Sequence, residues 1–295
     1  MVRSILKPIA VAMIACGVVL SSVWATQPAK VRPATTAAAA KTYRQKVLNS
    51  GPVGYWRLGE TGGSTAKDET KFGLHGTYNG RPIFAERGAI HNDTNTAVRF
   101  DGSKSYVEIP ANRAFSQPTS GKGMTVEVWL RPDAIVFDGE TDDPYVFWLG
   151  KGTPGQFEWA FRLYSKNSTR PNRISAYIFN KNGGLGSGAF FQDEIKPKEW
   201  IHIVATFDAG SKANPKAGVS IYKNGVFRGG PTTQKGALYS SFNVTPQVGN
   251  APLRFGTRSF GSFLVGGLDE AAIYPRVLTA AEVADHYRAG SGKVK

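Results

Sequence analysis

The sequence contains very little cysteine. Cys16 is the only one in 295 residues, and it lies in a short apolar stretch near the N-terminus. A chain that loses this stretch has no cysteine at all, which excludes disulfides, thiolate–zinc sites and catalytic thiols. Long apolar runs are scarce as well. The apolar stretch Pro8–Leu20 is shorter than a membrane-spanning helix requires. The folded protein therefore depends on a well-packed core, with a bound metal as a further option.

The N-terminus has the features of an export signal. Arg3 and Lys7 precede the apolar stretch, and Val23-Trp24-Ala25 offers a small-residue cleavage site. We therefore predict a signal peptide over residues 1–25 and a secreted or cell-envelope protein. Two alternatives stay open: an uncleaved anchor, and lipidation at Cys16. Either one would bring the protein to a membrane.

Composition changes along the rest of the chain. Residues 26–48 are rich in Pro, Ala and Thr, which predicts a flexible linker, with a short helix over Thr42–Asn49 as a lead-in. From Gly51 onward, short alternating runs are separated by Gly, Asn and Pro, the pattern of an all-β domain. We predict one sandwich domain over residues 49–290 and a tail over 291–295.

Several runs predict individual strands. The clearest are 124–131, 157–164, 173–179, 200–208 and 219–223. The run 200–208 is apolar on both faces, which is typical of an inner strand in a two-sheet stack. Asn224-Gly225 follows the last run and predicts a tight hairpin, because a type I′ turn needs positive φ at both central residues. Asn182-Gly183 and Asn79-Gly80 repeat this signal more weakly.

The closing segment combines three local signals. Leu268–Tyr274 predicts a last strand, and Pro275 ends it because proline has no N–H to give to a sheet. Thr279 and Glu282 form a capping box, which predicts that a short helix begins there and ends near Gly290.

Five blocks in this order resemble the laminin-G-like, concanavalin A-like jelly-roll domains of bacterial extracellular proteins. The blocks are Tyr55–Leu58 with Asp68, Ala97–Gly102 with Tyr106–Pro110, Met124–Pro132, Trp200–Asp208 with Tyr222–Gly225, and the segment after Leu268. The resemblance implies a jelly-roll sandwich of two antiparallel sheets, often with one bound calcium. It also implies a module that binds carbohydrate or protein without catalysis, although fold alone does not fix function.

The resemblance implies a calcium site as well. In this family a carboxylate early in the domain lies close to the aspartate of the last strand, and Asp68 and Asp269 match these positions. Calcium binds several oxygens from carboxylates and carbonyls. The alternative is that Asp269 caps a turn while Asp68 is solvated. A second acidic loop, Asp138–Asp143, lacks the spacing of an EF-hand, so we expect it to be a solvated loop.

The net charge of +14 is high for an exported domain, and it drops by only two when Arg3 and Lys7 leave with the signal. This favours an anionic partner, such as acidic polysaccharide, a cell-envelope glycan or lipid headgroups, although simple solubility explains it equally well. Lys and Arg are scattered along the chain, so we expect no nucleic-acid partner.

Catalytic motifs are hard to find. Glucanases with this fold carry Glu-x-Asp-x-x-Glu on one strand, whereas Glu127 has Trp129 two residues on and Glu158 has Ala160. We interpret both glutamates as carboxylates on strand surfaces. The sequence has no His-Glu-x-x-His, nucleophile elbow or phosphate loop. A polysaccharide lyase with a Tyr or His base stays open as an alternative.

Aromatic residues outside the family blocks are candidates for sugar contacts, because flat rings stack on sugar rings. We predict ligand contacts for Trp148, Trp159, Tyr239 and Phe260, with burial in the core as the alternative. Together these observations predict an exported, non-catalytic module that recognises carbohydrate, with acidic polysaccharide as one option. A polysaccharide-cleaving enzyme on the same scaffold and a surface adhesion protein are the alternatives.

Overall fold

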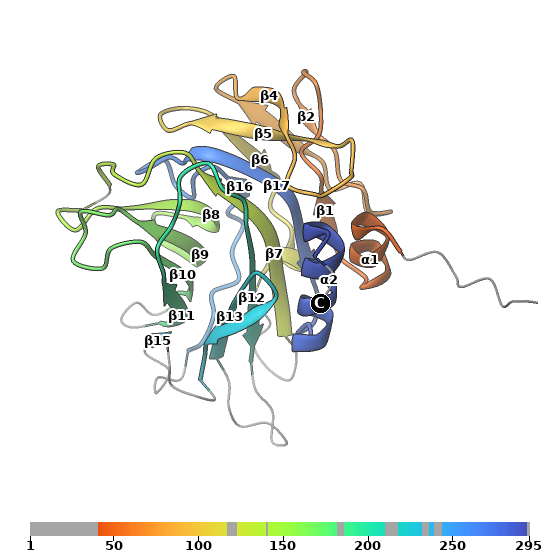
Figure 1. Cartoon of the computed structure of the whole chain (residues 1–295). Helices are drawn as coiled ribbons and strands as arrows, with labels where there is room; N and C mark the ends of the chain where they lie inside the picture. Colours follow the sequence, from red (N-terminus) through yellow and green to blue (C-terminus); the bar gives the residue numbers. More distant parts are fainter. Residues whose placement is uncertain are drawn as a thin grey trace, which may run out of the picture. The chain divides into compact units, whose positions relative to one another are not determined.

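The computed structural model describes residues 41–116, 123–139, 141–181, 186–209, 218–231, 236–238 and 244–293. These residues form two antiparallel β-sheets, two α-helices and one short 3-10 helix, η1 (Arg113–Phe115) (Figure 1). The predicted signal peptide and most of the predicted linker lie outside this part. Within it, neither helix has the length and apolar character needed to cross a bilayer.

The first sheet, which we call sheet A, has eight strands. Its order is β14 (Val226–Gly229), β13 (Gly218–Lys223), β12 (Ile201–Asp208), β7 (Gly123–Pro132), β17 (Val265–Tyr274), β5 (Thr96–Asp101) and β4 (Ile83–Arg87), and β1 (Gly54–Trp56) also pairs with β17. The two longest strands, β7 and β17, lie side by side at its centre.

The second sheet, sheet B, has nine strands. Its order is β15 (Ala237–Leu238), β11 (Ser187–Gln192), β10 (Arg173–Ile178), β9 (Gln156–Tyr164), β8 (Tyr145–Thr153), β16 (Leu253–Phe255), β6 (Tyr106–Ile109), β3 (Gly76–Asn79) and β2 (Thr65–Ala66). The two sheets confirm the predicted jelly-roll sandwich.

The main core lies between the sheets. Ile203, Ala205 and Phe207 of β12 are fully buried there with Trp159 and Phe161 of β9. The other face of β12 belongs to a second apolar cluster, which includes Val204 and residues of both helices. Both faces of β12 are therefore apolar for different reasons: one faces sheet B and the other is covered by helices.

Helices α1 (Tyr43–Asn49) and α2 (Ala280–Ser291) cover the outer face of sheet A. Tyr43 and Val47 of α1 and Val283 of α2 are buried in the second cluster. The helices lie on one side of the molecule, and strands β8 to β11 lie on the opposite side (Figure 1). Helix α1 confirms the short helix predicted over Thr42–Asn49, and because it is packed into the domain, the predicted flexible linker over 26–48 does not extend to its stated end.

Glu127 forms a buried polar centre beneath the helices. Its Oε1 accepts hydrogen bonds from Tyr43 (3.0 Å) and His202 (2.8 Å), and its Oε2 accepts from Tyr274 (2.6 Å) and His286 (2.9 Å). Burial alone would raise the pKa of Glu127, but the two histidines hold the pKa well below its usual value. Our interpretation of Glu127 as a strand-surface carboxylate is wrong, because segments distant in the sequence cover this position.

Local signals located most elements within a residue or two. Strand β17 ends before Pro275, the Thr279–Glu282 capping box starts α2, and Asn224 and Gly225 have the positive φ of a type I′ turn. Helix α2 ends at Ser291, one residue past the predicted Gly290, and Gly292 is its C-cap. Asn79-Gly80 does not join neighbouring strands, because β3 belongs to sheet B and β4 to sheet A. Asn182-Gly183 lies outside the described residues.

Candidate functional site

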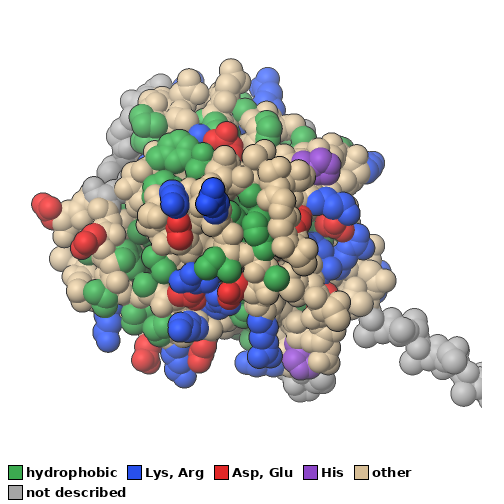
Figure 2. Space-filling model, turned by 90° about the horizontal axis from the view of Figure 1, so that it is seen from above, with side chains coloured by type: hydrophobic (Ala, Val, Ile, Leu, Met, Phe, Trp, Pro, Cys, Tyr) green, Lys and Arg blue, Asp and Glu red, His purple; other side chains and the backbone are tan. Residues whose placement is uncertain are grey.

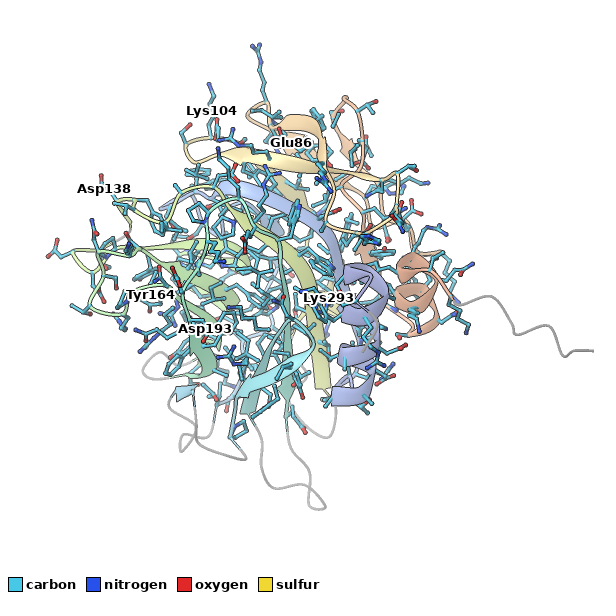
Figure 3. The ribbon with its side chains drawn as sticks, viewed as in Figure 1. Glu86, Lys104, Asp138, Tyr164, Asp193 and Lys293 are labelled. Carbon is cyan, nitrogen blue, oxygen red and sulfur yellow. The ribbon has the colours of Figure 1, made fainter. Side chains whose placement is uncertain are left out.

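The outer face of sheet B carries arginine and aromatic side chains side by side. Successive strand residues alternate between faces, and Phe161, Leu163 and Ile174 point into the core, so their neighbours point outward. We call this outward set the platform; it comprises Tyr145, Phe147, Arg162, Tyr164, Arg170, Arg173, Tyr177 and Phe190. Figure 3 labels Tyr164 on the side of the sandwich away from the helices.

Strand pairing fixes the order of the platform residues. Phe147 pairs with Arg162, Arg162 with Ser175, and Ser175 with Phe190, so these four residues form one row across β8, β9, β10 and β11. Tyr145 pairs with Tyr164 in the neighbouring row. Antiparallel pairing in a rigid sheet therefore places these groups, and no single segment of sequence contains the arrangement.

The guanidinium groups lie against the rings. The Cζ of Arg162 is 4.8 Å from the ring centre of Tyr177 and 5.6 Å from that of Tyr145. The Cζ of Arg173 is 3.9 Å from the Phe190 ring centre. These distances are in the range of cation–π interactions, which hold a planar guanidinium in a defined place.

The third arginine, Arg170, has an acidic partner. Its guanidinium lies 4.6 Å from the Tyr164 ring centre and pairs with Asp143, with Nε 2.9 Å from the carboxylate. Asp143 also accepts hydrogen bonds from Ser168 and from the backbone and hydroxyl of Thr169. These contacts hold the pKa of Asp143 well below its usual value, the Ser168 hydrogen bond most of all. Asp143 thus anchors the loop that positions Arg170.

Arg162 and Arg173 have no carboxylate partner among the described residues. Arg162 donates to the Tyr164 hydroxyl at 3.2 Å, and its buried Nε lacks an acceptor. Arg173 donates to the side-chain carbonyl of Gln192 at 3.1 Å. Burial lowers the pKa of Arg173, and the positive charges of Arg170 and Arg162 lower it further. Arg162 and Arg173 therefore carry positive charge that no carboxylate in the described segments neutralises.

Arg258 extends the same arrangement over the neighbouring strands. Its Cζ lies 3.5 Å from the Phe147 ring centre and 3.8 Å from that of Phe157, and it is almost fully buried. Phe147 thus contacts guanidinium groups from two separate segments.

A cavity of about 630 Å³ lies elsewhere, beside the loop that joins β4 to β5. Its lining includes Arg131, Lys198 and the half-buried Trp200, whose ring centre is 5.3 Å from the Arg131 guanidinium. Arg131 is already paired with Glu86 (2.9 Å) and Asp133 (3.0 Å). Figure 2 views the molecule from the β4–β5 side and shows basic and acidic side chains interspersed there. The other two basic residues of the lining, Arg87 and Lys198, are exposed, whereas the unpaired arginines of the platform are half-buried against aromatic rings.

The structure places the four predicted ligand contacts in different surroundings. Trp148 and Trp159 are fully buried in the main core, so their prediction as ligand contacts is wrong. Phe260 is 47% exposed, lies 5.1 Å from the Tyr106 ring and stacks with Arg254 at 4.4 Å. Tyr239 lies outside the described residues. The structure therefore does not bring the four together.

The predicted calcium ligands do not form a shared site in the described structure. Both oxygens of Asp68 are occupied, because they accept from the backbone N–H groups of Tyr55, Thr70 and Leu74 and from the Thr70 hydroxyl. Asp269 accepts from the Ala89 N–H, which leaves one buried oxygen without a partner.

One free oxygen is far fewer than the six to eight that calcium takes. No group of three or more His, Cys or acidic side chains in the described segments is placed to hold a metal ion. The residues present therefore do not fit a calcium shared by Asp68 and Asp269.

The acidic pair in β17 is structural. Glu270 has positive φ (54°) at an irregularity in the strand, is fully buried, and pairs with Arg57 at 2.7 Å. Burial raises its pKa to about 7, and burial together with Glu270 raises the pKa of Asp269 well above its usual value. Arg276, which follows this strand, pairs with Glu282.

Sequence reasoning missed the platform. The signal was present as outward positions that alternate aromatic and basic, such as Arg162 and Tyr164 in β9. Each such strand reads as an ordinary amphipathic strand, so the pattern acquires meaning only when the strands are placed side by side.

Comparison with known proteins supports the fold. Residues 101–284 match the family model described as the concanavalin A-like lectin/glucanases superfamily. No curated protein sequence matches the chain at a significant level. Solved structures with a similar fold include the botulinum neurotoxin type G receptor binding domain, with 14% identity and a TM-score of 0.52 over 80% of this chain and 51% of that one.

Two further solved structures are complexes. The botulinum neurotoxin serotype D ligand binding domain with N-acetylneuraminic acid is 9% identical, with a TM-score of 0.56 over 81% of this chain and 51% of that chain. The binding domain of botulinum neurotoxin DC with rat synaptotagmin II is 10% identical, with a TM-score of 0.56 over 82% and 52%. The chain thus spans about half the length of these structures, and the likeness concerns the fold alone.

Proposed function

The chain belongs to the concanavalin A-like lectin/glucanases superfamily, and on this basis we propose that it is a binding module that recognises carbohydrate through the platform. The observation that carries the proposal is the group of partly exposed platform residues on the outer face of sheet B, namely Tyr145, Arg162, Arg173 and Phe190. It combines apolar rings with hydrogen-bond donors on a rigid scaffold, the combination that sugar sites use.

Solved relatives of the fold support a binding role in general. One of the similar structures is a complex with N-acetylneuraminic acid and another is a complex with a protein, synaptotagmin II. We favour a glycan for this chain because arginine donors and aromatic rings share one surface. Cell-envelope glycans and other polysaccharides are the proposed partners.

A non-catalytic role is supported by where the carboxylates lie. Glu127, Asp269 and Glu270 are fully buried, and Glu158 is buried in an ion pair with Lys151. Each of these carboxylates stabilises the fold from a buried position, where a polysaccharide on the protein surface would not contact it. Our interpretation of Glu158 as a surface carboxylate is therefore wrong.

We also propose that the protein works outside the cytoplasm, as a secreted or cell-envelope protein. The support is the basic flank, apolar stretch and cleavage site within residues 1–25. Mass spectrometry of the mature N-terminus tests this proposal. A chain that begins after Ala25 supports it, whereas an intact Met1 in the cytoplasmic fraction contradicts it.

Affinity electrophoresis against neutral and acidic polysaccharides tests the binding function. We expect at least one polysaccharide to retard the protein, and Phe190→Ala to weaken that binding about fivefold or more, since a stacked ring contributes roughly 1 kcal/mol. Phe72→Ala is the matched control, because Phe72 is 53% exposed in the loop between β2 and β3.

Three outcomes would contradict the proposal. The absence of retardation by every polysaccharide would refute carbohydrate binding. An equal loss in Phe190→Ala and Phe72→Ala would refute the platform as the site. The release of new reducing ends or unsaturated sugars during incubation would show that the protein is an enzyme.

A further inference from the structure

We propose that Arg162 and Arg173 form an anionic subsite on the platform, and that its ligand is an acidic polysaccharide whose carboxylate groups bind these two guanidiniums. The inference rests on the proposed carbohydrate-binding function and adds the chemical class of the sugar. It also assigns the recognition to two residues that no motif in the sequence indicates.

The first step is the contrast between these two arginines and the others. Many arginines in the described structure have a carboxylate partner; the pairs include Arg44–Glu69, Arg57–Asp93, Arg99–Asp133, Arg131–Glu86, Arg228–Asp193, Arg254–Glu108 and Arg276–Glu282. Arg87 and Arg113 have no such pair, but they are exposed and remain hydrated. Arg162 and Arg173 are half-buried, and neither has a carboxylate partner in the described segments.

The second step is the charge balance around Tyr164. The guanidiniums of Arg170, Arg173 and Arg162 lie 4.6, 5.9 and 6.0 Å from its ring centre, and Asp143 is the carboxylate bound to one of them. Arg162 and Arg173 therefore bring two positive charges next to Arg170, and neither has a carboxylate partner among the described residues. A ligand anion would relieve the remaining repulsion, and it would do so in a partly desolvated place where charges interact strongly.

The aromatic rings fix the orientation of both guanidinium groups. A guanidinium that stacks on a ring keeps its N–H groups in its own plane, where they can donate to a carboxylate two at a time. Arg173 stacks on Phe190, and Arg162 lies within cation–π distance of Tyr177 and Tyr145. Rings thus hold both donors in place before a ligand arrives, which reduces the entropy lost on binding.

Binding to polygalacturonate tests the subsite, with its highly methyl-esterified form as the neutral counterpart. We expect Arg162→Gln and Arg173→Gln each to weaken binding to polygalacturonate about tenfold or more, and to change binding to the esterified polymer less than threefold. Arg87→Gln is the matched control, because it removes the same charge from an exposed position in β4. We expect it to bind polygalacturonate within twofold of the wild type.

The salt dependence provides a second readout. Each of the two platform variants should show a shallower fall of affinity with salt than the wild type, because one charge contact is lost. Arg162→Lys keeps the charge without the planar fork, and we expect an intermediate affinity. If the melting temperature of Arg162→Gln shows that this variant does not fold, Arg162→Lys takes its place in the comparison. Dextran sulfate compared with dextran then shows whether sulfate can replace carboxylate.

The outcomes separate the two proposals. If the wild type binds neither polymer nor any other polysaccharide, the proposed function is wrong and the subsite falls with it. If the wild type binds both polymers equally and the platform variants bind like it, only the subsite is wrong. An equal loss in Arg87→Gln and the platform variants would also overturn the subsite, because it would show attraction by net charge alone.

Discussion

Replacing Glu127 by glutamine tests the buried centre that joins both helices to sheet A. The variant keeps the volume of the side chain but removes its charge and turns one oxygen into an NH2 group. Two of the four donors around Glu127 then face another donor, whichever way the amide is placed. Neither position is accessible to water, since the carboxylate is fully buried.

The expected loss follows from those contacts. A hydrogen bond to a charged group contributes about 1.5–3 kcal/mol, so two lost bonds cost roughly 3–6 kcal/mol. The tyrosine hydroxyls can rotate to accept from the new amide, which places the expected loss near the lower end, at about 3–4 kcal/mol. For a domain of this size, that corresponds to a fall in Tm of roughly 10 °C.

Urea unfolding followed by tryptophan fluorescence measures the change, and Glu199→Gln serves as the control. Glu199 is exposed, so the same chemical change there should alter the free energy of unfolding by less than about 0.5 kcal/mol. Glycan binding by the folded Glu127→Gln variant should be unchanged, because the platform lies on the outer face of the other sheet. A loss below about 1 kcal/mol would refute the reasoning, since it would mean that the four donors find other acceptors.

Three further predictions concern buried charge and calcium. Burial raises the pKa of Glu270 from 4.5 to about 7, so its contribution to stability is complete below pH 4.5 and lost as the pH rises through 7. As the pH is raised from 5 to 8, we expect the midpoint of urea unfolding to decrease, by the equivalent of at most roughly 3 kcal/mol in the free energy of unfolding. A Glu270→Gln variant that shows the same pH dependence would contradict this prediction. Lys151→Met should lower the free energy of unfolding by about 3–5 kcal/mol, because it leaves the buried Glu158 carboxylate without its charged partner. Adding Glu158→Leu to this variant should recover most of that loss. A double variant no more stable than Lys151→Met would contradict this prediction. Finally, the occupied oxygens of Asp68 predict the same Tm in EDTA and in millimolar calcium, and a rise with calcium that Asp269→Asn abolishes would restore the calcium site.

The closing segment was predictable because its signals are local. Pro275 ends a strand wherever it stands, and Thr279 and Glu282 cap a helix through contacts three residues apart. The Asn224-Gly225 hairpin was predictable for the same reason, since two backbone angles decide the turn. The alternation of the strands then gave the fold class, because a sandwich needs many short strands with an apolar face.

The orientation of aromatic rings was not predictable from alternation. Strand β8 is irregular between Phe147 and Leu149, so Trp148 and Leu149 both reach the core although they are adjacent. Such an irregularity adds a residue to one strand relative to its partner, and it shifts which side chains face inward. Trp148 was therefore expected at the surface and lies inside, whereas Phe147 points to the platform.

Glu127 illustrates the other limit. Its position opposite the core face of β7 was correct, but that face is not in solvent, because α1 and α2 cover it from opposite ends of the chain. Strand alternation states which face a residue is on and cannot state what covers that face.

The sequence by itself determined an all-β sandwich, the closing strand and capped helix, and the excess of positive charge, because each depends on composition or on neighbours a few residues apart; the jelly-roll arrangement was implied by the family resemblance. Only the tertiary structure decided which of those charges remain unpaired. Arg170 meets Asp143 from 27 positions away, whereas Arg162 and Arg173 meet rings and no described carboxylate. Such pairings depend on which strands lie side by side, and the packing of the whole sandwich sets that.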